Sequence, residues 1–149
     1  MSDPLRVSFD VACAPEHAFS VWTTRISSWW PRDHTVSGRA DAEVVLQGRV
    51  GGRIYERTPD GLEHEWGEVT RWEPPTRLGY VWHIGQDRTN ATDVEIRFSP
   101  LDDASTRVDI EHGGWKRLGA AAEERRAQNR GGWDSLIPEF VAAIEKGGG

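Results

Sequence analysis

The chain has 149 residues, 37% of them hydrophobic, and its 18 Lys and Arg against 24 Asp and Glu give a net charge of −6. This length predicts a single domain, residues 1–149, which can bury a core without disulfides or a structural metal. The acidic balance argues against nucleic acid as a partner, because that binding depends on clustered Lys and Arg, and no apolar run approaches the length that would predict a membrane span.

The N-terminal part of the chain predicts one strand followed by two short helices. Residues 7–11 alternate between apolar and polar, which is typical of a half-buried strand. Pro15 suits the first turn of a helix because its missing N–H would be unpaired there. A second short helical segment is predicted over residues 26–30, and the polar stretch 32–41 predicts a loop.

Residues 43–112 predict about six antiparallel strands, separated by turn residues such as Pro59-Asp60-Gly61. In the clearest strands, 92–98 and 106–112, one face is apolar and the other is charged. This alternation is typical of an antiparallel sheet that is covered on one side only. His112 is in phase with the apolar face, so we expect its side chain to point inward.

The C-terminal segment predicts a long amphipathic helix that covers the sheet. The helix is expected to extend back to about residue 120, to be weakened by Gly131-Gly132, and to kink or to start late at Pro138, with a kink preferred. Residues 147–149 are expected to fray. The apolar residues at helical spacing are Trp133, Leu136, Ile137, Phe140, Val141 and Ile144.

Three local patterns carry a family resemblance. Residues 51–55 read Gly-Gly-Arg-Ile-Tyr, residues 67–82 contain Gly-x-Val and Pro-Pro-x-x-Leu, and residues 129–136 contain Gly-Trp-x-x-Leu. Together with the order of elements, they resemble the homologues of the activator of heat-shock-protein ATPase (AHSA-like), within the SRPBCC superfamily of START-like and birch-pollen-allergen-like domains. The resemblance covers nearly the whole chain.

The resemblance implies an α+β helix-grip fold. In that fold a curved antiparallel sheet of about six to seven strands wraps around a long C-terminal helix, and two short helices follow the first strand. A cavity between the sheet and the last helix is expected. The family includes cochaperone domains, binders of apolar small molecules and cyclase-like proteins, so membership predicts a cavity more firmly than a reaction.

Eight tryptophans are the most informative feature of the composition. On the concave sheet and the long helix, their flat rings and N–H groups are suited to line a ligand cavity. The alternative is that these side chains fill the space themselves. The residues predicted to bind a ligand are Trp22, Trp30, Trp66, Tyr80, Trp82, His112, Trp115 and Trp133.

Three polar side chains, His112, Tyr80 and Glu68, are the candidates for acid–base catalysis in such a cavity. Glu68 shares a strand face with Trp66, and that face is either concave or solvated. For His112, a structural role with a bond to the backbone is the alternative. The dispersed histidines predict no metal site, no cofactor is implied, and the lone cysteine, Cys13, favours a reducing compartment, so we expect a cytoplasmic protein.

The leading hypothesis is a module that binds a small hydrophobic or aromatic molecule between the sheet and the C-terminal helix. One alternative is an enzyme of the cyclase or aromatase type that acts on an enclosed apolar substrate. Another is a cochaperone-like interaction domain, which would need an exposed patch such as Trp29-Trp30. The sequence leaves the oligomeric state open, a homodimer included.

Overall fold

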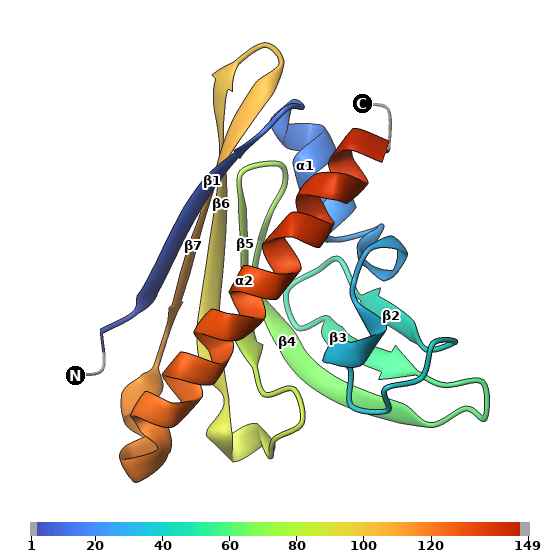
Figure 1. Cartoon of the computed structure of the whole chain (residues 1–149), viewed down its shortest axis with the longest axis vertical. Coiled ribbons are helices and arrows are strands. Elements are labelled where there is room, and N and C mark those ends of the chain that lie inside the picture. The colour runs from blue at the N-terminus through green and yellow to red at the C-terminus, as the bar shows by residue number, and fades with distance from the viewer. Residues whose placement is uncertain (1–2, 147–149) are drawn as a thin grey trace.

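The structure, a computed structural model, describes residues 3–146 as a seven-stranded antiparallel sheet that curls around one long helix (Figure 1). The strands lie in the order β1-β7-β6-β5-β4-β3-β2, so the first strand pairs with the last. This is the predicted α+β helix-grip fold. The tail predicted to fray, residues 147–149, lies outside the described residues.

The predicted strands and helices lie in the expected order along the chain, and residues 3–146 contain three further short helical turns that the sequence did not predict. The strands are β1 (Leu5–Val11), β2 (Glu43–Leu46), β3 (Arg53–Arg57), β4 (Glu63–Glu73), β5 (Arg77–Trp82), β6 (Thr92–Asp102) and β7 (Ser105–Gly113). The helices are α1 (Pro15–Trp22), η1 (Ile26–Ser28), η2 (Arg32–His34), η3 (Arg88–Asn90), η4 (Trp115–Ala121) and α2 (Ala122–Lys146). Among residues 3–146, no helix combines the length and the apolar character that crossing a membrane would require.

The short helical turn η2 lies in a stretch that the sequence predicted to be a loop. Side-chain hydrogen bonds to nearby backbone explain it, because Trp30 is buried and its indole Nε1 donates a hydrogen bond to the carbonyl oxygen of His34 at 3.0 Å. Arg32 also donates to the carbonyl oxygen of Trp30 at 2.6 Å. These side-chain bonds to the backbone hold the chain in a turn that local propensity does not predict.

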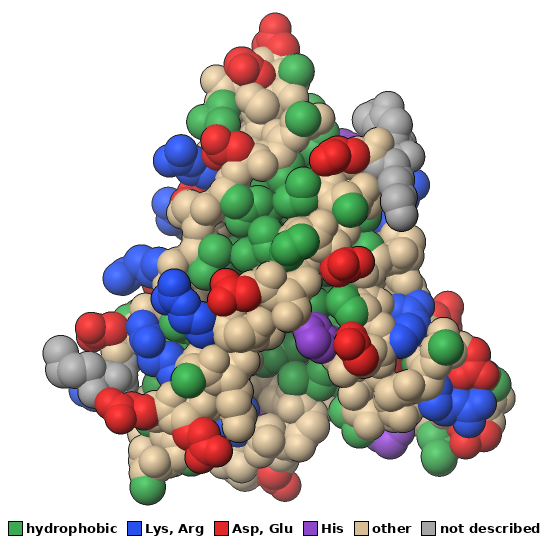
Figure 2. Space-filling view, viewed as in Figure 1, with side chains coloured by type: hydrophobic (Ala, Val, Ile, Leu, Met, Phe, Trp, Pro, Cys, Tyr) green, Lys and Arg blue, Asp and Glu red, His purple; other side chains and the backbone are tan. Residues whose placement is uncertain are grey.

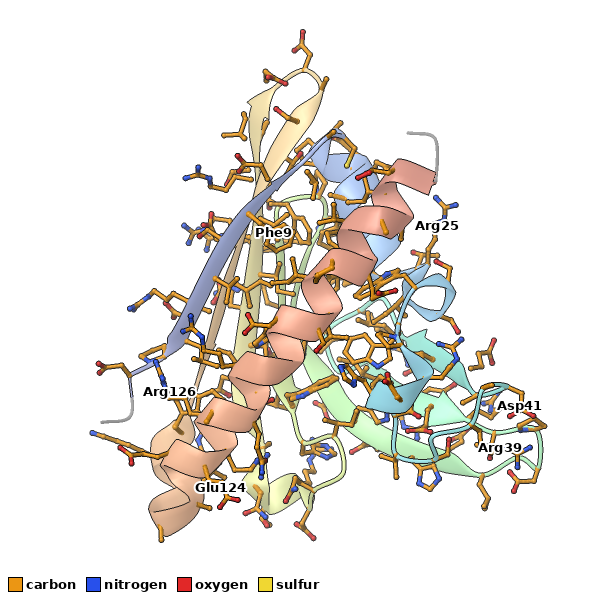
Figure 3. All side chains as sticks on the ribbon, in the orientation of Figure 1. Phe9, Arg25, Arg39, Asp41, Glu124 and Arg126 are labelled. Carbon is orange, nitrogen blue, oxygen red and sulfur yellow. The ribbon has the colours of Figure 1, made fainter. Side chains whose placement is uncertain are left out.

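Helix α2 crosses the concave face of the sheet and supplies its cover. Phe9 of β1 points toward the helix and meets Phe140 edge-on, with ring centroids 6.1 Å apart (Figure 3). The helix starts at Ala122, close to the predicted residue 120, and continues through Gly131-Gly132 and Pro138. A late start at Pro138 is therefore excluded.

A β-bulge decides which side of β4 faces the core. Relative to β3, the strand carries an extra residue at Trp66. Trp66 is fully buried, whereas Glu68 is partly exposed and forms an ion pair with Arg88, Oε1 to Nη2, at 2.5 Å. The prediction that Trp66 and Glu68 share a face is wrong, because a bulge interrupts the alternation on which it rests.

Candidate functional site

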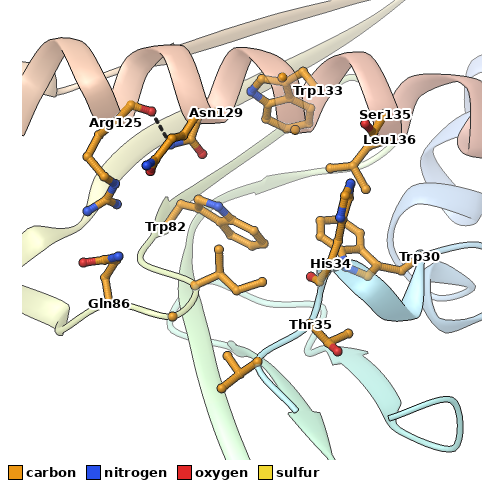
Figure 4. Close-up of a pocket in the computed structure, with 16 residues that line it drawn as sticks. Trp30, His34, Thr35, Trp82, Gln86, Arg125, Asn129, Trp133, Ser135 and Leu136 are labelled. Carbon is orange, nitrogen blue, oxygen red and sulfur yellow. Dashed lines mark hydrogen bonds between the residues drawn. The ribbon is translucent and has the colours of Figure 1, made fainter. Parts of the chain in front are cut away.

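A cavity of about 540 Å³ lies between the N-terminal half of α2, the segment 34–36 that follows Trp30, and the end of β5 with the loop after it (Figure 4). This volume is in the range of ordinary small-molecule sites. The cavity is where the helix-grip resemblance places it, between the last helix and the sheet.

Apolar side chains form most of the cavity wall. Three of them are tryptophans from three separate parts of the chain: Trp30 after η1, Trp82 at the end of β5, and Trp133 on α2 (Figure 4). The rings of Trp30 and Trp82 pack together with their centroids 5.7 Å apart. The other apolar lining residues are Val36, Ile84 and Leu136.

The remaining predicted ligand-binding residues lie behind this wall or in the neighbouring core. Trp66 packs against Trp30 at 5.1 Å between ring centroids, and Tyr80 packs against Trp82 at 5.5 Å. Three further residues, Trp22, His112 and Trp115, are fully buried and do not line the cavity either. The tryptophans therefore do both things considered from the sequence: some border the cavity and others fill the core that supports it.

His112 joins two of the lining tryptophans through a chain of hydrogen bonds. The indole Nε1 of Trp133 can only donate, so His112 Nδ1 accepts that bond, at 3.1 Å. The proton of the neutral ring therefore sits on Nε2, which donates to Thr92 Oγ1 at 2.7 Å. The Thr92 hydroxyl in turn donates to the carbonyl oxygen of Trp82 at 3.3 Å. We call this chain the His112 relay.

The His112 relay leaves neither ring nitrogen of His112 free for chemistry. The side chain is fully buried, and burial lowers its pKa from 6.5 to about 3, so the ring is neutral at pH 7. This arrangement favours the structural role over acid–base catalysis. The partners are the side chains of Trp133 and Thr92, in place of the backbone partner considered from the sequence.

The other two catalytic candidates also lie away from the cavity lining. Tyr80 is buried on β5, and burial raises the pKa of its hydroxyl above the ordinary value. Glu68 lies on the opposite side of the sheet, where it pairs with Arg88. The structure therefore does not bring His112, Tyr80 and Glu68 together at one site.

Sequence reasoning missed the polar end of the cavity. The face of α2 that looks into it carries Arg125, Asn129, Gly132 and Leu136, at a spacing of four, three and four residues. This stripe is apolar in the second half of the helix and polar in the first. The change from polar to apolar residues along one face of the helix can be recognised in the sequence. It was the signal that could have indicated a site here.

His34 is a further polar lining residue, and no pattern in the sequence singled it out. It lies at the other end of the cavity from Arg125 (Figure 4). Its Nε2 is buried and has no hydrogen-bond partner among residues 3–146. Buried polar atoms without a partner are uncommon, and a bound molecule is one way to satisfy them.

Glu56 fixes the segment that carries part of the wall, and it too was missed. Its carboxylate is fully buried and accepts hydrogen bonds from the backbone N–H of Val36 at 2.5 Å and of Ser37 at 3.0 Å. It also accepts one from Trp66 Nε1 at 2.8 Å. Burial by itself would raise the pKa of Glu56, but the hydrogen bonds from Ser37, Val36 and Trp66 outweigh it and the pKa is lowered. Alternation with Ile54 on β3 was the signal that Glu56 points inward.

Comparisons with known proteins agree with this architecture. Among solved structures, the anthrahydroquino-gamma-pyrone synthase Txn09 is 34% identical to this chain, with 82% of this chain and 83% of that chain covered and a TM-score of 0.58. CalC from Micromonospora echinospora, a self-sacrificing resistance protein, is 26% identical, with 97% and 96% covered and a TM-score of 0.72. Protein NE0264 from Nitrosomonas europaea is 13% identical, with 97% and 95% covered and a TM-score of 0.66, and shows the fold alone. No curated protein matches the chain.

The family comparison covers most of the sequence. Residues 12–145 match the model described as Activator of Hsp90 ATPase homolog 1-like protein, which takes in every element from α1 to the last turns of α2. That range includes the Gly-Gly, Pro-Pro and Gly-Trp patterns on which the resemblance rested. The chain therefore belongs to the family of Activator of Hsp90 ATPase homolog 1-like proteins.

Proposed function

We propose that this protein binds a planar, largely apolar aromatic molecule in the cavity between α2 and the sheet. The observation that carries the proposal is the convergence of Trp30, Trp82 and Trp133 on one cavity of about 540 Å³. Flat aromatic walls favour flat aromatic guests, because stacked or edge-on rings bury much area at favourable geometry. No cofactor is implied.

Two of the three tryptophan walls are held in position by hydrogen bonds within the protein. Trp30 is held by its bond to the carbonyl oxygen of His34, and Trp133 by its bond to His112. A wall that is already ordered loses little conformational freedom on binding, which favours affinity. The 34% identical relative carries the name anthrahydroquino-gamma-pyrone synthase, and that name also supports an aromatic guest here.

The first experiment is extraction of the protein, purified from its native host, with organic solvent, followed by mass spectrometry. A stoichiometric aromatic compound would identify the guest. In parallel, calorimetric titration with anthracene-2-carboxamide, a neutral planar probe, tests the cavity directly. We expect binding to the wild type and at least about tenfold weaker binding to Trp82→Ala, since truncation of a well-packed aromatic contact costs more than about 1.4 kcal/mol.

Phe9→Ala is the matched control, because Phe9 is a partly buried aromatic residue that packs against α2 outside the cavity lining. It should keep the affinity of the wild type for anthracene-2-carboxamide. Failure of the wild-type protein to bind this probe, together with an empty extract, would count against the proposed function.

Catalysis on the enclosed guest is the second candidate function, and His34 is the observation that favours it. Its unpartnered Nε2 borders the cavity, where it is placed to accept or donate a proton. The test is incubation of the extracted compound or its host metabolite fraction with the wild type and with His34→Gln. Conversion by the wild type alone would assign the role, and equal conversion by both proteins would remove it.

A chaperone contact through Trp29 and Trp30 lacks the surface that it would need. The two side chains are 6% and 4% exposed. Trp29 donates its indole N–H to the carbonyl oxygen of Val21 at 2.8 Å, inside the core. Neither side chain is accessible to a partner protein, and a homodimer stays a prediction.

A further inference from the structure

At one end of the cavity, polar side chains surround the guanidinium group of Arg125. Arg125 and Asn129 come from α2, and Gln86 faces them from the loop after β5 (Figure 4). Gln128 adds another amide to the lining. Asn129 is held in place because its Nδ2 donates to the carbonyl oxygen of Arg125 at 2.8 Å.

Arg125 carries a charge that the protein does not neutralise. Within residues 3–146, its guanidinium has neither an ion pair nor a hydrogen bond. Many arginines on the outer surface differ in this respect: Arg88 pairs with Glu68 at 2.5 Å, and Arg117 pairs with Asp93 at 2.6 Å. Figure 2 shows acidic and basic side chains interspersed around the apolar surface beside α2.

The cost of this arrangement appears in the pKa of Arg125. Burial lowers the pKa of its guanidinium, because the charged form loses contact with water and gains no partner in exchange. A half-buried cation without a counter-charge destabilises the folded protein. A site that holds such a charge is ready to receive an anion, which would restore the missing interaction.

Resting on the proposed function, we infer that the guest is an aromatic acid whose carboxylate or phenolate oxygen binds Arg125, while its rings lie between Trp82 and Trp133. A guanidinium presents a planar set of donors that matches the oxygens of such a group. The amides of Gln86 and Gln128 are additional donors at the same end. Arg125 thus acts as a specificity-determining residue that sets the orientation of the guest.

Gly132 supports this orientation. It lies on the same face of α2, between Asn129 and Leu136, and a Cβ added there would meet no atom within 4 Å. The helix therefore leaves open space between its polar and apolar ends. A flat ring system can extend from Arg125 past Gly132 toward the tryptophans.

The test compares two probes of the same shape, anthracene-2-carboxylate and its neutral carboxamide, by calorimetry at pH 7. We expect the wild type to bind the carboxylate about tenfold more tightly, the effect of one charge-assisted hydrogen bond. Arg125→Gln should lose this preference and bind both probes with similar affinity. Its melting temperature should equal or exceed that of the wild type, because an unpaired, half-buried charge is removed.

Arg130→Gln is the control, since Arg130 is an exposed arginine of the same helix outside the cavity and its loss changes the net charge equally. It should keep the preference for the carboxylate. Equal binding of the two probes to the wild type, or a preference that survives Arg125→Gln, would overturn the role of Arg125 and leave the proposed function standing. Failure of both probes to bind the wild type, together with an empty solvent extract, would overturn both.

Discussion

At the scale of single residues, His112 fixes the positions of two walls of the cavity relative to each other. Its Nδ1 accepts from Trp133 of α2, and its Nε2 donates to Thr92, which reaches the backbone of Trp82. A histidine suits this place because a neutral imidazole has one donor and one acceptor in a rigid ring. One of the three residues considered for acid–base catalysis thus has a positioning role.

The buried neutral state of His112 makes stability depend on pH. The folded pKa is about 3, against an ordinary 6.5, so between these values the unfolded chain binds more protons and stability rises with pH. From this group alone, the free energy of unfolding should fall by up to about 1.4 kcal/mol per pH unit below pH 6. His112→Gln should be less stable at pH 7 and should lose this part of the slope.

The measurement is urea denaturation between pH 4 and pH 7. His64→Gln is the control, because His64 is a partly buried histidine on β4 outside the His112 relay. An unchanged slope in His112→Gln would mean that the imidazole is not held neutral.

Glu56 carries a second prediction at this scale. Glu56→Ala leaves the N–H groups of Val36, Ser37 and Trp66 without their shared acceptor. We expect a loss of about 2–4 kcal/mol, since each buried donor left unpaired costs about 1–3 kcal/mol and the segment 36–37 can relax toward water. Glu56→Gln keeps one acceptor oxygen and should lose less. Chemical denaturation at pH 7 checks the order, and equal stability of the three proteins would refute it.

The pH dependence of Glu56 has its own sign. Its folded pKa is lowered from 4.5, so the stabilisation is present above the unfolded value and is lost as the pH falls through the folded one. Glu56 and His112 therefore both weaken the folded state in acid. As the pH is lowered, the contribution of His112 begins to fall at a higher pH than that of Glu56.

At the scale of elements, α2 performs two tasks with two halves. Its second half buries Leu136, Phe140 and Ile144 against the sheet. Its first half presents Arg125 and Asn129 to the cavity. A glycine pair in the middle of a helix lowers helix stability. Here the pair lies at the boundary between the two halves, where the absence of side chains leaves space for a guest.

Gly132→Leu tests whether this space is used for binding, because the substitution should raise the stability of the helix and lower the affinity for a guest. The helix should become more stable by about 0.5–1 kcal/mol, from propensity alone. The affinity for anthracene-2-carboxamide should fall at least about tenfold, since the new side chain occupies the cavity. Ala127→Leu, on the exposed side of α2, is the control and should leave binding unchanged. A Gly132→Leu protein that binds as the wild type does would show that the cavity beside Gly132 is not used.

At the scale of the whole molecule, the curved sheet acts as a rigid frame and the cavity lies where three segments meet over one end of it. Two of these segments, 34–36 and 84–86, lie outside the strands and α2. Segments with few backbone hydrogen bonds to neighbouring strands unfold locally more readily than residues within the sheet. A guest that bridges them to α2 should therefore order the cavity rim more than the sheet.

Hydrogen exchange with and without saturating anthracene-2-carboxamide measures this effect. We expect slower exchange in 34–36, in 84–86 and in the first half of α2, with little local change in β1 and β7 beyond the global stabilisation. At a ligand concentration of 100 times Kd, that global gain is about 2.7 kcal/mol. Protection confined to β1, β6 and β7, away from the cavity lining, would place the probe at another site.

The sequence by itself determined the fold and the direction in which most side chains point. The alternation in β6 and β7 and the helical spacing from Trp133 to Ile144 both depend on local geometry, and both predicted buried faces correctly. The Gly-Gly, Pro-Pro and Gly-Trp patterns then identified the family. Periodicity failed at Trp66, where a single extra residue in β4 changes the phase.

Only the tertiary structure decided which inward side chains border empty space. Trp66 and Trp82 are both buried, yet one supports the wall and the other forms it. A periodic pattern gives the face of an element but not the distance from that face to the next element, and a cavity exists only where this distance exceeds what the side chains fill. For the same reason, the unpaired charge of Arg125 could not be read from the sequence, because the absence of a partner depends on every segment that packs around it.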